Sequence, residues 1–162
     1  MSYKRYLSFT LVQILVILFL SSAFAYEKHN SPFCGPEVLS RVYEKLKVGY
    51  SLEKISAIAG KSHGFTSYDD LINDAKRHQL KAFVFKEGDR ITLEAAFLQG
   101  PVIINNRGHF VLIENVTDRG VSIYDPGFGF EHYTLPWEMF QGHWDGYGLV
   151  LNKKPVLLDS KK

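Results

Sequence analysis

The sequence predicts an α+β domain, because a helical first half is followed by a second half of short strands. Between residues 34 and 80, apolar side chains recur at the spacing of amphipathic helices. From residue 82 onward, short apolar runs alternate with glycine, proline and asparagine, which is typical of buried strands joined by turns. The 162 residues suffice for one domain with its own hydrophobic core.

The first predicted helix begins at Cys34. Pro36 suits its first turn, where the N–H that proline lacks would have no intrahelical partner. The apolar residues that then repeat at helical spacing are Val38, Leu39, Val42, Tyr43 and Leu46.

Two further helices are predicted before the sheet. A short one opens at 50–53, continues through Ile58 and closes at Gly60. The other begins at Ser67, a favoured N-cap residue, with Asp70 three residues later to complete a capping box. It continues through His78.

The second half contains predicted strands and one short helix around 93–98. Gly120 closes a turn, and 143–146 is interpreted as a packed corner before the last strand. The predicted strands are 82–85, 101–105, 110–113, 121–124 and 146–151.

The first 25 residues have the pattern of an export signal. Lys4 and Arg5 give a positive start, 11–20 is apolar except for Gln13, and Ala23-Phe24-Ala25 is a typical cleavage signal. Cleavage there would leave a single domain at 26–155 and a polar tail at 156–162.

An uncleaved anchor is the alternative, because residues 6–25 form an apolar stretch long enough to span a bilayer. With Lys4 and Arg5 retained on the inner side, both interpretations place the domain outside the cytoplasm. We expect a periplasmic or secreted protein, or one anchored by 6–25 to the outer face of the inner membrane. Contact with a membrane is expected only if this segment is retained.

The charge balance excludes an obvious nucleic-acid partner. The 19 basic residues of the chain include Lys4 and Arg5, and the remaining basic residues equal the 17 acidic ones in number. No basic stripe persists beyond the N-terminal segment, so we expect no binding to nucleic acid.

Cys34 is the only cysteine, so in an exported chain it cannot form an internal disulfide. Its predicted position is a helix N-terminus, where unpaired backbone N–H groups and the helix dipole stabilise a thiolate. A nucleophile is therefore predicted. The alternative is a buried structural cysteine.

His109 and Asp125 are the predicted partners of this cysteine. His109 stands at the mouth of an apolar strand beside Gly108, and Asp125 follows the next strand. A turn at 118–120 would make the two strands adjacent, so that the carboxylate could bond one ring nitrogen and set the tautomer. The alternatives are a core histidine and a plain turn aspartate.

Cysteine, histidine and carboxylate in this chain order are the arrangement of a papain-like cysteine peptidase. In that fold, N-terminal helices carrying the cysteine pack on an antiparallel sheet carrying the histidine and the aspartate, and the peptide lies in the cleft between them. A metal site built from Cys34, His109 and a carboxylate is the minor alternative, since the other histidines lack metal-ligand spacing and no second cysteine exists. We expect no metal and no cofactor.

The motifs in their order resemble the bacteriocin-processing cysteine peptidases, which remove double-glycine leader peptides at the front of certain peptide-exporting ABC transporters. The resemblance covers nearly all of the chain beyond residue 25. The matching motifs are Cys34-Gly35-Pro36, Ser51-Leu52-Glu53, Leu71 and Ala75 with Leu80 and Ala82, Pro101-Val102-Ile103, His109-Phe110-Val111-Leu112, Asp125-Pro126, and Trp144 with Gly146.

The resemblance implies a nucleophilic Cys34, His109 as base and acid, and an orienting Asp125. It implies a peptide or protein substrate, with small residues at the cleavage site. An export transporter would then have to be supplied by another chain, because no transporter or ATP-binding segment is recognised in this one.

One departure from the family concerns the oxyanion hole. Family members usually carry a glutamine six residues before the cysteine, whereas Lys28 occupies that position here. Losing one oxyanion donor costs about 100- to 1,000-fold in rate. Asn30 or Lys28 could replace the missing amide beside the Cys34 backbone N–H.

The departure supports a rival function, a peptide-binding module that keeps the fold and has lost catalysis. A third possibility uses the same residues for acyl transfer to an amine other than water. The sequence favours an exported cysteine peptidase over both.

Overall fold

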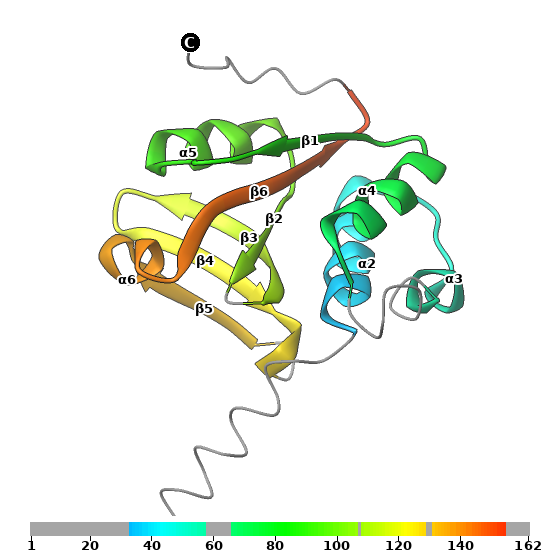
Figure 1. The fold of residues 1–162 in the computed structure, drawn as a ribbon, viewed down its shortest axis with the longest axis horizontal. Coiled ribbons are helices and arrows are strands. Elements are labelled where there is room, and N and C mark those ends of the chain that lie inside the picture. Colours follow the sequence, from blue (N-terminus) through cyan, green and yellow to red (C-terminus); the bar gives the residue numbers. More distant parts are fainter. Residues whose placement is uncertain (1–32, 58–65, 107, 129–130, 155–162) are drawn as a thin grey trace, which may run out of the picture.

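The computed structural model describes residues 33–57, 66–106, 108–128 and 131–154, and these form the predicted α+β architecture. The helical half and the sheet half are clearly separated in Figure 1. The helices are α2 (Cys34–Leu46), α3 (Leu52–Ser56), α4 (Tyr68–Arg77), α5 (Arg90–Gln99), η1 (Pro126–Phe128) and α6 (Trp137–Gln141). The strands are β1 (Lys81–Phe85), β2 (Val102–Asn106), β3 (His109–Thr117), β4 (Gly120–Asp125), β5 (Glu131–Pro136) and β6 (Trp144–Asn152).

All six strands form one antiparallel sheet in the order β1-β6-β2-β3-β4-β5. The predicted turn between β3 and β4 is confirmed, with Thr117 paired to Gly120. Further along this hairpin Leu112 pairs with Tyr124, so the first residues of β3 lie beside the last residues of β4.

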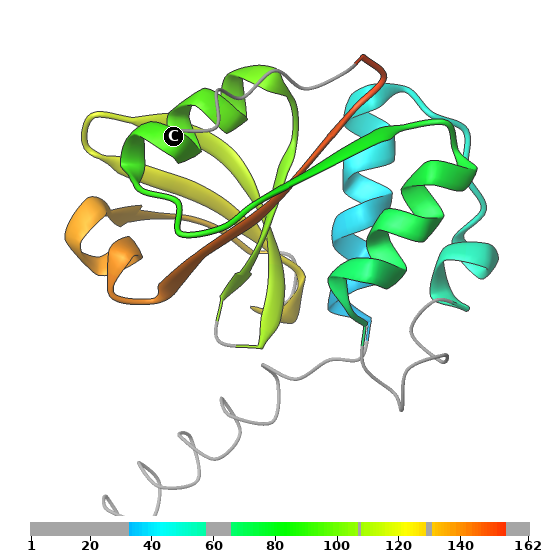
Figure 2. The same cartoon turned by 45° about the horizontal axis from the view of Figure 1, so that its top comes forward.

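The sheet is covered on both faces, which explains why its strands are apolar runs rather than alternating patterns. Figure 2 shows α2 and α4 together on one side and α5 on the other. The buried sheet residues packed with α2 and α4 are Ile103, Phe110, Leu112, Tyr124, Leu149 and Leu151. Those packed with α5 and α6 are Phe85, Val102, Ile104, Val111, Ile113, Val121, Ile123, Trp144 and Val150.

The structure corrects several expected boundaries. The short second helix ends at Ser56, and the predicted end at Ile58 to Gly60 lies outside the described residues. Helix α5 is longer than expected because the Asp89 side chain caps it by accepting from the Thr92 N–H at 2.8 Å. The capping box of Ser67 and Asp70 at the start of α4 is confirmed.

The largest error lies after the Asp125 strand. Neither β5 nor α6 was predicted, because Glu131–Pro136 alternates weakly and Trp137–Gln141 is too short to show a helical period. The expected corner at 143–146 is partly wrong: Trp144 and Gly146 are buried residues within β6.

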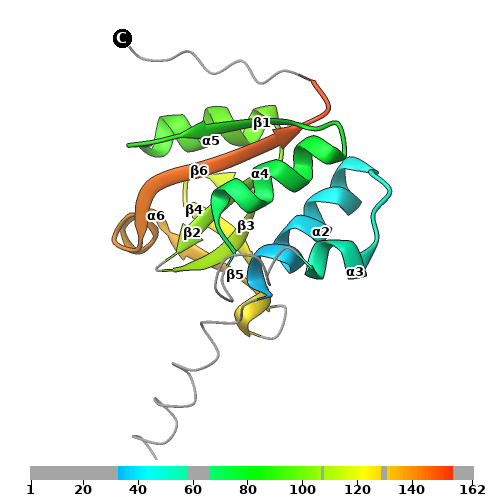
Figure 3. The ribbon, with the colours of Figure 1, turned by 45° about the vertical axis from the view of Figure 1, so that its right-hand side comes forward.

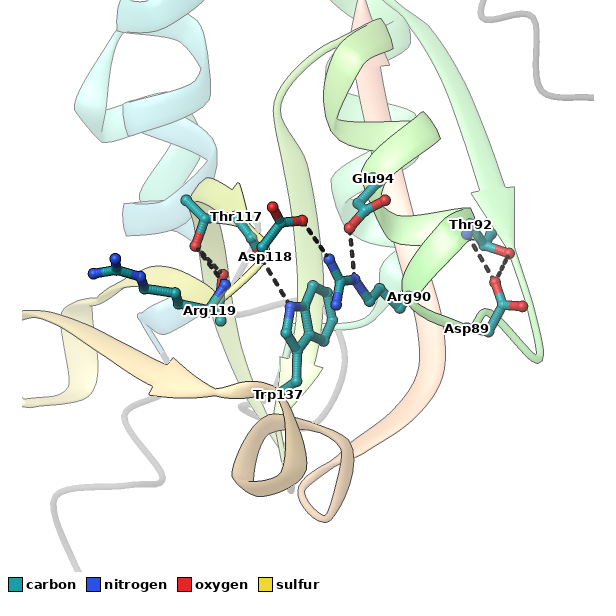
Figure 4. Close-up of polar contacts among 9 residues, drawn as sticks. Asp89, Arg90, Thr92, Glu94, Thr117, Asp118, Arg119 and Trp137 are labelled. Atoms are coloured by element: carbon teal, nitrogen blue, oxygen red, sulfur yellow. Dashed lines mark hydrogen bonds and ion pairs between the residues drawn. The ribbon is translucent and has the colours of Figure 1, made fainter.

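A polar cluster ties α5 to the far end of the β3–β4 hairpin (Figure 4). The Arg90 guanidinium lies 5.0 Å from the ring centroid of Trp137 and donates to Glu94 at 2.7 Å and Asp118 at 2.8 Å. The Trp137 indole N–H donates to the Thr117 carbonyl at 2.8 Å. These contacts fix α5 and α6 on the face of the sheet opposite α2.

No helix among the described residues is long and apolar enough to cross a membrane. The predicted signal or anchor at 1–25 and the tail at 156–162 lie outside those residues.

A buried carboxylate joins α2 to α4. Asp74 is 3% exposed and accepts a hydrogen bond from the Tyr43 hydroxyl at 2.7 Å. His78 Nδ1 lies 3.3 Å from the same carboxylate, and the Tyr43 and His78 rings are 4.7 Å apart. This network therefore holds α2 and α4 together on the helical side of the domain.

We predict that Tyr43→Phe lowers the free energy of unfolding by about 1.5–3 kcal/mol, because a buried charged acceptor loses its donor. Urea unfolding followed by circular dichroism measures the loss. Tyr50→Phe is the matched control, since it removes a hydrogen bond from an exposed carboxylate, Glu44, at 2.9 Å. Equal destabilisation by both substitutions would contradict a special role for the buried network.

Candidate active site

Three elements bring the predicted site residues together. Cys34 is the first residue of α2, His109 the first of β3, and Asp125 the last of β4. Figure 3 shows the start of α2 beside the segment that follows β4. All three side chains are buried, with exposures of 6%, 2% and 1%.

His109 and Asp125 form a close buried pair. Ring nitrogen Nε2 of His109 lies 2.5 Å from Asp125 Oδ1. The β3–β4 register sets this contact, because it places the start of one strand next to the end of the other. A carboxylate bonded to Nε2 leaves Nδ1 as the nitrogen available to the cysteine.

The lack of a side chain at Gly127 permits the contact between His109 and Asp125. Its N–H donates to Asp125 Oδ1 at 2.8 Å, and a Cβ atom at this position would lie 2.6 Å from Cε1 and Nε2 of His109. The glycine after Asp125-Pro126 is therefore required by close approach of the imidazole, not only by a turn.

Tyr133 is a site residue that the sequence analysis missed. Its hydroxyl donates to Asp125 Oδ2 at 3.0 Å. Tyr133 pairs with Ile123 across the β4–β5 ladder, so it shares a sheet face with Asp125 two residues further along. The signal available in the sequence was the alternation of Tyr133 and Leu135 with polar neighbours.

Cys34 is held against His109 at the start of α2. The side chain of Cys34 lies close enough to the imidazole to raise its pKa, and the first helical hydrogen bond runs from the Glu37 N–H to the Phe33 carbonyl at 2.9 Å. The backbone N–H groups of Cys34 and Gly35 precede that bond and so have no intrahelical acceptor. Gly35 is needed here, because a Cβ atom would lie 2.5 Å from the Thr66 methyl group.

The interactions between His109 and Asp125 favour the charged form of each side chain. Burial by itself would lower the pKa of His109, but hydrogen bonds to Asp125 and Cys34 raise it from 6.5 to about 9. Burial likewise opposes ionisation of Asp125, and its hydrogen bond with His109 outweighs this, so that its pKa is lowered. A protonated imidazole beside a cysteine is the group that gives a proton to the leaving amine in thiol catalysis.

The two expected oxyanion residues, Lys28 and Asn30, lie outside the described residues. Within those residues, no group of three or more His, Cys, Asp and Glu side chains is arranged to hold a metal ion. The described residues of the site offer a thiol, an imidazole and a carboxylate, which together support nucleophilic catalysis.

Comparison with known proteins gives one family match. The sequence profile of the Peptidase C39 family matches residues 25–156. A comparison with curated protein sequences gives no significant match.

Solved structures show the same fold. The chain is similar to the peptidase domain of Streptococcus ComA, a bifunctional ABC transporter involved in quorum sensing, with a TM-score of 0.65, 21% identity, and coverage of 75% of this chain and 91% of that one. A double-glycine-motif protease from an AMS/PCAT transporter, solved in complex with the leader peptide, has a TM-score of 0.59 and 24% identity, with coverage of 73% of this chain and 82% of that one. The N-terminal peptidase C39-like domain of a toxin secretion ATP-binding protein from Vibrio parahaemolyticus has a TM-score of 0.57 and 17% identity, with coverage of 76% of this chain and 98% of that one.

We predict that the imidazole of His109 stays protonated through neutral pH and titrates near pH 9 in an NMR titration. Because the folded-state pKa exceeds the unfolded value of about 6.5, the stabilisation from this group is complete below about pH 6.5 and is lost as pH rises through about 9. Asp125→Asn should lower the pKa of His109 well below its wild-type value, because the hydrogen bond to the carboxylate helps to raise it. A His109 titration near 6.5 in both proteins would contradict the ion pair.

Proposed function

The chain belongs to the Peptidase C39 family, and we propose that it is a cysteine peptidase in which Cys34 is the nucleophile, His109 the base and acid, and Asp125 the orienting carboxylate. The observation that carries the proposal is the buried chain of contacts from Cys34 through His109 to Asp125. A nucleophile bonded to a base that a third group orients is the arrangement that covalent catalysis requires.

The first half of the reaction forms a thioester. The Cys34 thiolate attacks the peptide carbonyl carbon, and the oxyanion is stabilised by the Cys34 backbone N–H at the start of α2. As the C–N bond breaks, the His109 imidazolium gives its proton to the leaving amine. Asp125 keeps the ring oriented through Nε2.

The second half releases the acid. Neutral His109 takes a proton from water, the resulting hydroxide attacks the thioester carbonyl, and the thiolate leaves. His109 is then an imidazolium again, so the thiolate and its counterion are restored. Tyr133 and Gly127 hold the Asp125 carboxylate through both halves.

We further propose a peptide substrate with small residues at the cleavage site, as in a double-glycine leader. The support is the family membership and the likeness to a protease whose structure contains a leader peptide. The apolar segment at 6–25 supports action outside the cytoplasm, where an export transporter supplied by another chain would deliver the peptide.

We predict that Cys34→Ala lowers turnover of a double-glycine leader peptide by at least about 1,000-fold, because the covalent intermediate can no longer form. Mass spectrometry of the products measures turnover and separates a free acid from an amine adduct. Binding of the peptide, measured by calorimetry, should be the same in both proteins. Unchanged cleavage by the alanine variant would overturn the mechanism, and binding without product by the wild type would favour the peptide-binding module.

We predict that Tyr133→Phe lowers kcat about tenfold with little change in KM, because Asp125 loses one donor and holds His109 less firmly. Tyr50→Phe, which changes a hydroxyl away from the triad, is the control and should leave kcat unchanged. A loss shared equally by the two variants would show that Tyr133 does not act through Asp125.

A further inference from the structure

Glu37 lies one turn after the nucleophile on α2, beside the buried face of that helix and only partly buried itself. Cys34, Glu37 and Arg41 are spaced by three and four residues and so share one face of α2. At one end of this face Cys34 contacts His109 on β3, and at the other the Arg41 guanidinium lies 5.6 Å from the ring centroid of Tyr124 on β4. Glu37 therefore lies over the same two strands, between these contacts.

The carboxylate of Glu37 forms no ion pair with any of the described residues. Arg41, four residues on, is its natural intrahelical partner, but the Arg41 guanidinium donates to Glu44 at 2.9 Å. Glu37 is half-buried, and no hydrogen bond or ion pair forms to its side chain within the described part of the chain.

Burial raises the pKa of Glu37, and the nearby charge of His109 offsets this only in part. The imidazolium is already committed to Asp125 and Cys34. Half-burying a carboxylate without a dedicated partner is unfavourable, and a cation placed beside it recovers part of that cost. Glu37 therefore adds a negative charge for which no described group is a dedicated partner.

We propose that Glu37 forms a subsite for a cationic group of the substrate beside the scissile bond, either a lysine or arginine side chain or a free amino terminus. This inference rests on the proposed peptidase function and adds a specificity determinant to it. Glu37 would act by binding and orienting substrate, not by proton transfer, since the Cys34–His109–Asp125 contacts do not include it.

The first test is a competition among peptides that share a central Gly-Gly and carry Lys, Arg or norleucine at each of the flanking positions. The peptides are N-acetylated, and one neutral peptide is added with a free amino terminus, so that the two sources of positive charge are distinguished. Wild type should cleave the best cationic peptide about tenfold faster than its norleucine counterpart. Glu37→Gln should lose that preference, whereas the exposed control Glu53→Gln on α3 should retain it.

A second test does not depend on cleavage. The rates at which cationic and anionic methanethiosulfonates modify Cys34 are each divided by the rate of a neutral reagent. Replacing Glu37 by Gln should lower the cation-to-anion ratio about tenfold, with no change in Glu53→Gln. A ratio that Glu37→Gln leaves unchanged would overturn the subsite even if peptides are cleaved. A lowered ratio without cleavage of any peptide would keep the subsite and remove the peptidase function.

Discussion

The buried contact between His109 and Asp125 is the interaction around which the rest of the site is arranged. Two ionisable groups at 2% and 1% exposure are tolerated only with their hydrogen-bonding capacity well filled. Asp125 accepts from the imidazole, from the Gly127 N–H and from the Tyr133 hydroxyl. The residues that surround the carboxylate thus make the charged histidine possible.

The sheet and the helices contribute different parts of this arrangement. The β3–β4 register and the neighbouring β5 set the His109, Asp125 and Tyr133 geometry. The cysteine comes from α2, whose position depends on the core shared with the sheet and on the Tyr43–Asp74 bond to α4. Because Cys34 is on a helix and His109 on the sheet, the packing of α2 on the sheet decides whether they meet.

Charge at the site is uneven along α2. The helix N-terminus and the imidazolium favour an anion at Cys34, while Glu37, one turn on, presents a carboxylate whose intrahelical partner has turned to Glu44. A substrate that places its carbonyl at the first point and a positive charge at the second would match both. Such a match uses binding energy next to the reacting atoms, where it can also orient the peptide.

The α+β class, the capped start of α4 and the β3–β4 turn could be predicted from the chain alone, because periodicity, capping and turn chemistry are local. Strand β5, helix α6, the role of Tyr133 and the reason for Gly127 became apparent only in the folded protein. Tyr133 reaches Asp125 across a strand pair, and Gly127 is constrained by a ring eighteen positions earlier in the chain. Glu37 is the acidic residue in the first turn of α2, and its proximity to His109 and Tyr124 follows only from the packing of α2 on the sheet. Contacts between segments distant in sequence leave no local pattern, so their energetics emerge only when the chain is folded.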